Sequence, residues 1–144
     1  MNQVVTLPAA EDAERIEAQR RWVREHFDED ARHLYEHRDQ KLRLLQTILD
    51  AGWIDASETV KLQCLGITLG DALVQELGLE WVMVEDEYGR DPAIRKPGTT
   101  VLAFPLTMIS KRVERGEAVV VRDLFDGVVE HVRRMASDRE YQSH

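Results

Sequence analysis

The stretch ASETVKLQCLGITLGDALVQELGLEWVMVEDEYGRDPAI, residues 56–94, decides the fold because its hydrophobic period changes at Gly78. Before Gly78, apolar residues cover most of the circumference of an expected helix over residues 56–77. A helix that is apolar nearly all round is typical of a buried element. After Gly78 the period becomes two over residues 79–84, which is typical of a strand. The sequence therefore predicts a central buried helix that leads directly into a sheet.

Turn residues extend this strand into an antiparallel meander. Tyr88-Gly89 supplies a turn, and residues 91–96 are expected to return as a short strand that Pro92 confines to a sheet edge. Pro97-Gly98 marks a second turn before a strand over residues 100–104. Residues 119–121 are compatible with one more short strand, so the expected sheet has three to four strands.

The remaining periodic segments predict helices around this sheet. Their expected ranges are 9–34 with a break near 28–30, 39–50 with Gly52 at its C-terminal end, 105–116 and 123–137. Together with the helix at 56–77, these segments define the class α+β: a small antiparallel sheet packed with about five helices.

Composition limits the partners. The chain has 144 residues, of which 43% are hydrophobic and 32% charged, as in ordinary globular proteins. Its 27 acids and 19 Lys and Arg residues give a net charge of −8. Because phosphate groups attract clustered Lys and Arg, this balance argues against nucleic acid and anionic membranes as partners. A basic protein would be attracted.

The lone cysteine and the absence of targeting signals indicate a cytosolic protein. Cys64 has no second cysteine with which to form a disulfide, and its apolar neighbours favour a core thiol over a nucleophile. No charged segment followed by an apolar run opens the chain. No apolar run approaches the ~20 residues that a membrane span requires.

Residues 69–116 carry a family resemblance. The succession LGDALVQELGLEW, VEDEYGRDPAI, LAFP and ISKRVERGE resembles a widespread bacterial family catalogued only as a domain of unknown function. The strongest points of similarity are Gly70-Asp71, Trp81, Asp86-Glu87-Gly89, Phe104-Pro105 and Lys111-Arg112. The resemblance implies a small α+β fold and brings no catalytic residues, and its motifs are equally compatible with fold determinants.

With this resemblance, the chain is expected to form a single domain over residues 1–144. Within it, residues 9–50 form an N-terminal helical part and residues 51–138 a family-like α+β part. The ends, residues 1–8 and 139–144, are expected to be flexible.

An acidic hairpin is the first candidate site. It contains Glu80, Glu85, Asp86, Glu87, Tyr88 and Asp91. Clustered carboxylates hold hard cations or share acid and base roles, but the spacing does not fit an EF-hand. Along a strand, Glu85 and Glu87 share one face while Asp86 points to the other. The favoured interpretation is a solvated turn that keeps a sheet edge soluble, followed by a partner-binding surface, and then by a metal or catalytic cluster.

A second pattern, His33, Glu36 and His37, spells H-x-x-E-H, the order in which two His and a Glu act in some zinc hydrolases. Such a site also needs a third ligand from another element, and Asp71 or Glu76 could supply it. Exposed polar residues on a surface helix are the favoured interpretation.

Two glycines and an acid within the central helix predict close packing and an ion pair. Gly66 and Gly70 lie one turn apart, a spacing that lets another part of the chain approach closely. Asp71 follows, and if buried it must be paired. Lys111 or Arg112 is the expected partner.

The tryptophans divide between core and surface. Trp81 is expected to anchor the core, while Trp22 or Trp53 is a candidate for an exposed interface anchor.

These observations favour a non-enzymatic cytosolic binding protein, in its most concrete form an immunity- or antitoxin-like protein that neutralises a basic protein partner such as a toxin. The expected contact residues are those of the acidic hairpin, and no cofactor is expected. The alternative is a metal-dependent enzyme or small-molecule binder that uses the hairpin carboxylates with Asp71, or His33, Glu36 and His37. A third possibility is a homodimer formed through the N-terminal helix.

Overall fold

A computed structural model describes residues 3–142 of the chain, with side chains through residue 138. The α-helices in this part are α1 (Ala10–Arg24), α2 (Arg38–Ala51), α3 (Thr59–Leu77), α4 (Met108–Glu114) and α5 (Val121–Gln142). The 3-10 helices are η1 (Glu29–Glu36) and η2 (Pro105–Thr107), and the strands are β1 (Val4–Thr6), β2 (Glu80–Asp86), β3 (Gly89–Arg95) and β4 (Leu102–Ala103). The predicted α+β class is confirmed.

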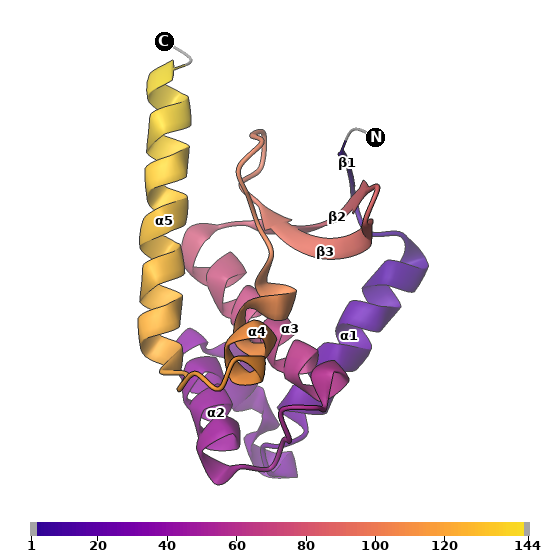
Figure 1. Cartoon of the computed structure of the whole chain (residues 1–144), viewed down its shortest axis with the longest axis vertical. Helices are drawn as coiled ribbons and strands as arrows, with labels where there is room; N and C mark the ends of the chain where they lie inside the picture. Colours follow the sequence, from indigo (N-terminus) through magenta and orange to yellow (C-terminus); the bar gives the residue numbers. More distant parts are fainter. Residues whose placement is uncertain (1–2, 143–144) are drawn as a thin grey trace.

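The sheet lies at one end of the molecule, with α1 on one side, α5 on the other and α3 between them (Figure 1). Helix α3 packs against α1, α2, α4 and α5. Its Leu62, Leu65, Ile67, Leu69 and Leu73 side chains are completely buried. The prediction of a central buried helix is therefore confirmed.

The glycines of α3 permit close contacts, as expected. A Cβ atom at Gly66 would lie 2.3 Å from the backbone oxygen of Leu106. At Gly70 it would lie 2.4 Å from the Trp81 ring and 2.8 Å from the Pro105 ring. Because real Cβ atoms do not approach other atoms so closely, the packing of η2 and β2 on α3 requires both glycines.

The sheet is antiparallel, in the order β1-β2-β3-β4. Strand β1 lies within the expected flexible lead-in, residues 1–8, and pairs with β2 through Val4–Thr6. The expectation that Pro92 confines its strand to an edge is wrong, because β3 lies between β2 and β4. Strand β4 pairs only with Ile94 and Arg95, so Pro92 lies beyond this pairing and its missing N–H breaks no bond to β4.

The short strand expected at residues 119–121 does not form, and α5 begins at Val121. The side chain of Gln46 replaces a neighbouring strand. Its Nε2 donates to the Val119 oxygen at 3.1 Å, and its Oε1 accepts from the Val121 N–H at 2.7 Å. One amide from α2 thus satisfies the backbone groups that a strand partner would have paired.

The predicted break of the first helix is confirmed, since α1 ends at Arg24 and η1 begins at Glu29. Helix α2 ends before Gly52, which has a φ of 68°, as predicted. Helix α5 continues to Gln142, beyond the expected end at 137. The flexibility expected for the last residues partly concerns 143–144, which lie outside the described residues. Among residues 3–142, no helix combines the length and hydrophobicity that a membrane crossing requires.

Gly66→Ala tests the packing of α3 against η2. The new methyl group meets backbone rather than a flexible side chain, so we expect the free energy of unfolding to fall by about 1–3 kcal/mol or more.

The matched control is Gly127→Ala in α5, where no atom lies within 4 Å of the added Cβ. This change should raise the stability by about 1 kcal/mol, because alanine favours a helix interior over glycine. Urea unfolding of both variants checks the pair, and equal effects would contradict the assigned packing.

Candidate functional site

A largely buried carboxylate, Asp71 of α3, gathers polar groups from three other elements. Its side chain is 11% exposed. Arg20 of α1 donates to it through Nε at 2.6 Å and Nη2 at 2.8 Å. The Tyr35 hydroxyl of η1 donates at 2.6 Å, and the Trp81 indole N–H of β2 donates at 3.0 Å. Each carboxylate oxygen accepts two hydrogen bonds, so the charge is neutralised by one arginine and fully hydrogen-bonded.

Asp71 is paired as expected, but Lys111 and Arg112 were the wrong partners. Arg112 donates through Nη1 to the Met108 oxygen of its own helix at 2.8 Å. Arg20 lies 51 positions from Asp71 in the sequence. Only the packing of α1 across α3 brings the two together.

Further side chains surround this Asp71 cluster of Arg20, Tyr35, Asp71 and Trp81. The Tyr35 hydroxyl also lies 3.0 Å from Thr68 Oγ1. The ammonium group of Lys41 lies 5.0 Å from the centroid of the Tyr35 ring and donates to Gln75 Oε1 at 2.8 Å. A cation over an aromatic face is favourable, most strongly where water is excluded.

Burial shifts the protonation equilibria around the Asp71 cluster. Burial, followed by the Asp71 charge, raises the pKa of Tyr35 well above its ordinary value. The hydrogen bond from Arg20 to Asp71 raises the pKa of Arg20. Burial lowers the pKa of Lys41, although the Asp71 charge opposes this effect. The cluster thus holds tyrosine neutral and arginine charged, as a structural anchor requires.

The β2–β3 hairpin tip consists of Glu85, Asp86, Glu87 and Tyr88, the central four of the predicted contact residues. Asp86 Oδ1 accepts the Tyr88 N–H at 2.8 Å, which fixes the turn. Gly89 has a φ of 136°, a backbone conformation that residues with a Cβ atom rarely adopt. The Tyr88 side chain is 89% exposed. Among the described residues, none forms a hydrogen bond or ion pair with the side chains of Glu85 or Glu87.

The other two predicted contact residues lie away from this tip. Glu80 begins β2, at the opposite end of the strand, and accepts two hydrogen bonds from Arg95 at 2.8 and 3.0 Å. Asp91 lies on β3 beside Pro92, next to a surface cavity that Lys111 also lines.

The hairpin is tied to α1 beside its turn. Arg90, the cross-strand neighbour of Glu85, donates to Asp12 at 2.5 Å. Asp12 also accepts the Ala9 N–H at 2.9 Å at the start of α1. The hydrogen bond from Arg90 lowers the pKa of Asp12, and the same bond raises the pKa of Arg90. The end of the hairpin that carries the turn is therefore attached to α1.

The zinc-like pattern of His33, Glu36 and His37 does not lie on one α-helix. His33 and Glu36 lie in the 3-10 helix η1, whereas His37 follows it with extended backbone angles of −98° and 130°. In a 3-10 helix, residues three apart share a face, and residues four apart do not. Across the described chain, no group of three or more His, Cys, Asp or Glu side chains is arranged to hold a metal ion. The geometry thus gives no support to the metal-dependent alternative.

The remaining candidates are a core thiol and an aromatic group. Cys64 is buried, and burial raises the pKa of its thiol.

His26 contacts Trp22 edge to face at 4.6 Å between ring centroids and stacks on Trp53 at 6.0 Å. Trp53 is 59% exposed, as expected for one of the two surface tryptophans. Trp81 is partly buried against the core.

Comparison with known proteins identifies the family to which the chain belongs. Residues 41–125 match a family described as a domain of unknown function, DUF3806. The chain belongs to this family, and the resemblance predicted from its sequence is confirmed. No curated protein matches it.

A crystal structure of a protein from Bacteroides thetaiotaomicron VPI-5482 has a similar fold, with a TM-score of 0.72 and 18% sequence identity. The similarity covers 91% of this chain and 48% of the other chain. This chain thus spans about half the length of that relative. At this identity the likeness shows the fold alone.

The residues that carry the family resemblance meet in the structure. The Trp81 and Pro105 rings pack against Gly70, and Asp71 accepts a hydrogen bond from the Trp81 indole N–H. Three separated motifs therefore form one packing unit between α3, β2 and η2. Asp86 and Gly89 form the hairpin turn. The Gly70-Asp71, Trp81 and Pro105 motifs are accordingly fold determinants, whereas the hairpin tip, Phe104 and Lys111 are exposed.

Tyr35→Phe tests the Asp71 cluster. We expect a loss of stability of about 1–3 kcal/mol at neutral pH, because Asp71 and Thr68 lose a buried partner. Folding raises the pKa of Tyr35, so its contribution is complete below about pH 10 and is lost as the pH rises further.

Urea unfolding of wild type and variant, at neutral pH and near pH 11, checks both parts. The stability difference should shrink at the higher pH. A difference that stays constant or grows would contradict the burial of a neutral tyrosine.

Proposed function

We propose that this chain is a non-enzymatic protein-binding module, an immunity- or antitoxin-like protein of the bacterial cytoplasm that neutralises a basic protein partner. Its contact surface is the hairpin tip. The observation that supports this proposal is the 89% exposure of Tyr88, which directly follows Glu85, Asp86 and Glu87, three carboxylates that have no ion-pair partner among the described residues.

The chemistry of the tip suits a cationic surface. Tyrosine is among the residues that most often contribute large shares of binding energy at protein interfaces. Glu85, Asp86 and Glu87 would guide a basic partner to the tip, and the net charge of −8 adds to this attraction. The aromatic ring then supplies contact area, and the carboxylates select Lys and Arg over neutral side chains.

Rigidity favours binding further. The tip is held by the Asp86 turn, by the Arg90–Asp12 ion pair and by the pairing of Val4 with Glu85. A surface that is ordered before binding loses little conformational entropy when the partner docks.

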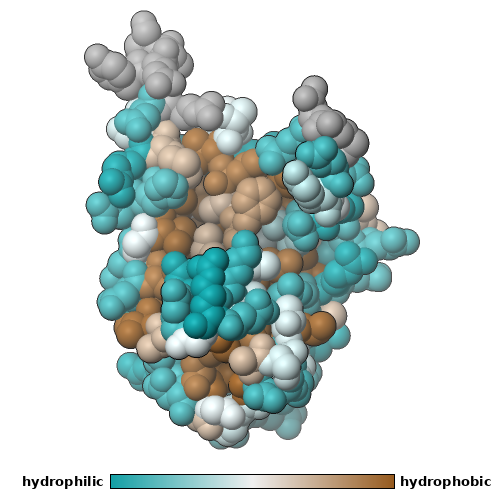
Figure 2. Space-filling model, viewed as in Figure 1, coloured by the Kyte–Doolittle hydropathy of each residue, from teal (hydrophilic) through white to brown (hydrophobic). Residues whose placement is uncertain are grey.

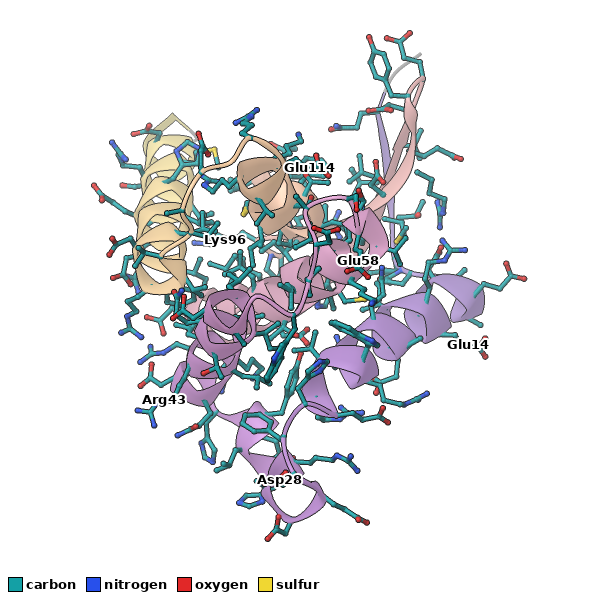
Figure 3. The ribbon with its side chains drawn as sticks, turned by 60° about the horizontal axis from the view of Figure 1, so that its bottom comes forward. Glu14, Asp28, Arg43, Glu58, Lys96 and Glu114 are labelled. Carbon is teal, nitrogen blue, oxygen red and sulfur yellow. The ribbon has the colours of Figure 1, made fainter. Side chains whose placement is uncertain are left out.

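Charge reversal of Glu85, Asp86 and Glu87 to Lys tests the proposal. The matched control reverses three other consecutive acids, Asp28, Glu29 and Asp30, which are exposed at a distant end of the molecule (Figure 3). Both variants change the net charge equally. We expect capture of basic proteins from a lysate of the source bacterium to be lost in the hairpin variant and kept in the control.

Tyr88→Ala should weaken the same capture by at least tenfold, since hot-spot residues contribute about 2 kcal/mol or more. Mass spectrometry identifies the captured proteins, and circular dichroism confirms the fold. Undiminished capture by the hairpin variant would refute the proposed surface. Equal loss of capture in both variants would show that capture depends on net charge and not on the hairpin.

A further inference from the structure

A groove runs between α5 and the segment from β4 to α4. It has a volume of about 540 Å³. Its lining residues include Phe104 and Met108 on one wall, Leu124, Gly127 and Val128 on the other, and Arg112 at the edge. Hydrophobic surface follows the flank of α5 that faces the middle of the molecule (Figure 2). Phe104 remains 40% exposed there.

Helix α5 has two apolar stripes. The first contains Val121, Phe125, Val129 and Val132, all buried in the body of the protein. The second, beside it, contains Leu124 and Val128 in the groove, which are only partly buried, and it continues to Val120 just before the helix, which is 53% exposed. One stripe suffices to attach a helix to its own domain. The second is available to another helix.

Gly127 is the feature of α5 that the chain itself leaves unexplained. Gly66 and Gly70 are required by atoms 2.3 to 2.4 Å from the point where a Cβ atom would lie, whereas no atom lies within 4 Å of the same point at Gly127. Glycine weakens a helix interior. A glycine also permits the close approach of another backbone, and within the described chain the space beside Gly127 is open to one.

Charges are placed symmetrically about Gly127. Asp123 lies four residues before it and His131 four residues after it, so all three share one face of α5 and line the same groove. Each lies about 6 Å from Gly127 along the helix axis. Within the described chain, neither Asp123 nor His131 forms a hydrogen bond or ion pair.

From this arrangement we propose that a second copy of this chain docks on the groove, so that the two α5 helices cross antiparallel about Gly127. A two-fold axis through Gly127 places Asp123 of each copy against His131 of the partner subunit. Two-fold dimers are the commonest assemblies of identical chains, and each patch is then its own complement. The interface lies on a different surface from the hairpin tip, so it goes beyond the proposed function.

The Asp–His pair occurs twice per dimer, once on each side of Gly127. Arg112 of α4 also lines the groove, so the partner's Asp123 approaches a surface that carries basic side chains.

Charge exchange tests the geometry. Asp123→Arg alone places Arg against His, and His131→Asp alone places Asp against Asp, so each variant should be monomeric. An equimolar mixture should form a heterodimer, because its two contacts become Arg–Asp and Asp–His. The double variant should dimerise, because both of its contacts become Arg–Asp. Sedimentation velocity over a concentration series measures all four samples.

Gly127→Leu provides a second test, since leucine favours a helix and meets no atom within the chain. This variant should remain folded, with an unfolding temperature at or above that of wild type, and should be monomeric. A monomeric wild type, a dimeric Gly127→Leu protein, or no association in the charge-exchanged mixture would each overturn the proposal. None of these results affects capture by the hairpin.

Discussion

The structure depends on one buried carboxylate. Asp71 lies in the central helix, and its four hydrogen bonds reach α1, η1 and β2. A buried charge without partners would strongly destabilise the fold, so these donors must be in place whenever the chain is folded. The N-terminal helices and the family domain are therefore held together at a specific register, not only by apolar contact.

The same constraint reaches the hairpin. Trp81, near the start of β2, donates to Asp71, and Arg90, near the start of β3, donates to Asp12 of α1. Both ends of the hairpin are thus connected to α1. The Trp81 end is connected through Asp71 and Arg20, and the Arg90 end directly through Asp12. The N-terminal helix thus also fixes the end of the hairpin that carries the exposed turn around Tyr88. Binding by the tip and stability of the interior are physically connected.

The sequence predicted those features that local chemistry determines. Three features could be predicted, because each follows from side chains close together in the chain. They are the change of period at Gly78, the close packing at Gly66 and Gly70, and the burial of the helix around these glycines. The partner of Asp71 was not, because Arg20 is separated from it by 51 positions and no local pattern encodes how two helices cross. The Gln46 amide, which takes the place of a strand beside residues 119–121, is equally invisible in a single sequence.

A double-mutant cycle on Arg20 and Asp71 tests the central claim most directly. Arg20→Met keeps the apolar stem and removes the charge, and Asp71→Ala removes the acceptor. Unfolding free energies of the wild type, both single variants and the double variant give the coupling between the two side chains. We expect a coupling of about 2–3 kcal/mol, because Arg20→Met leaves the Asp71 charge without its cation and Asp71→Ala leaves Arg20 with Glu17 alone as its anionic partner. A coupling below about 0.5 kcal/mol would contradict the central role of this pair.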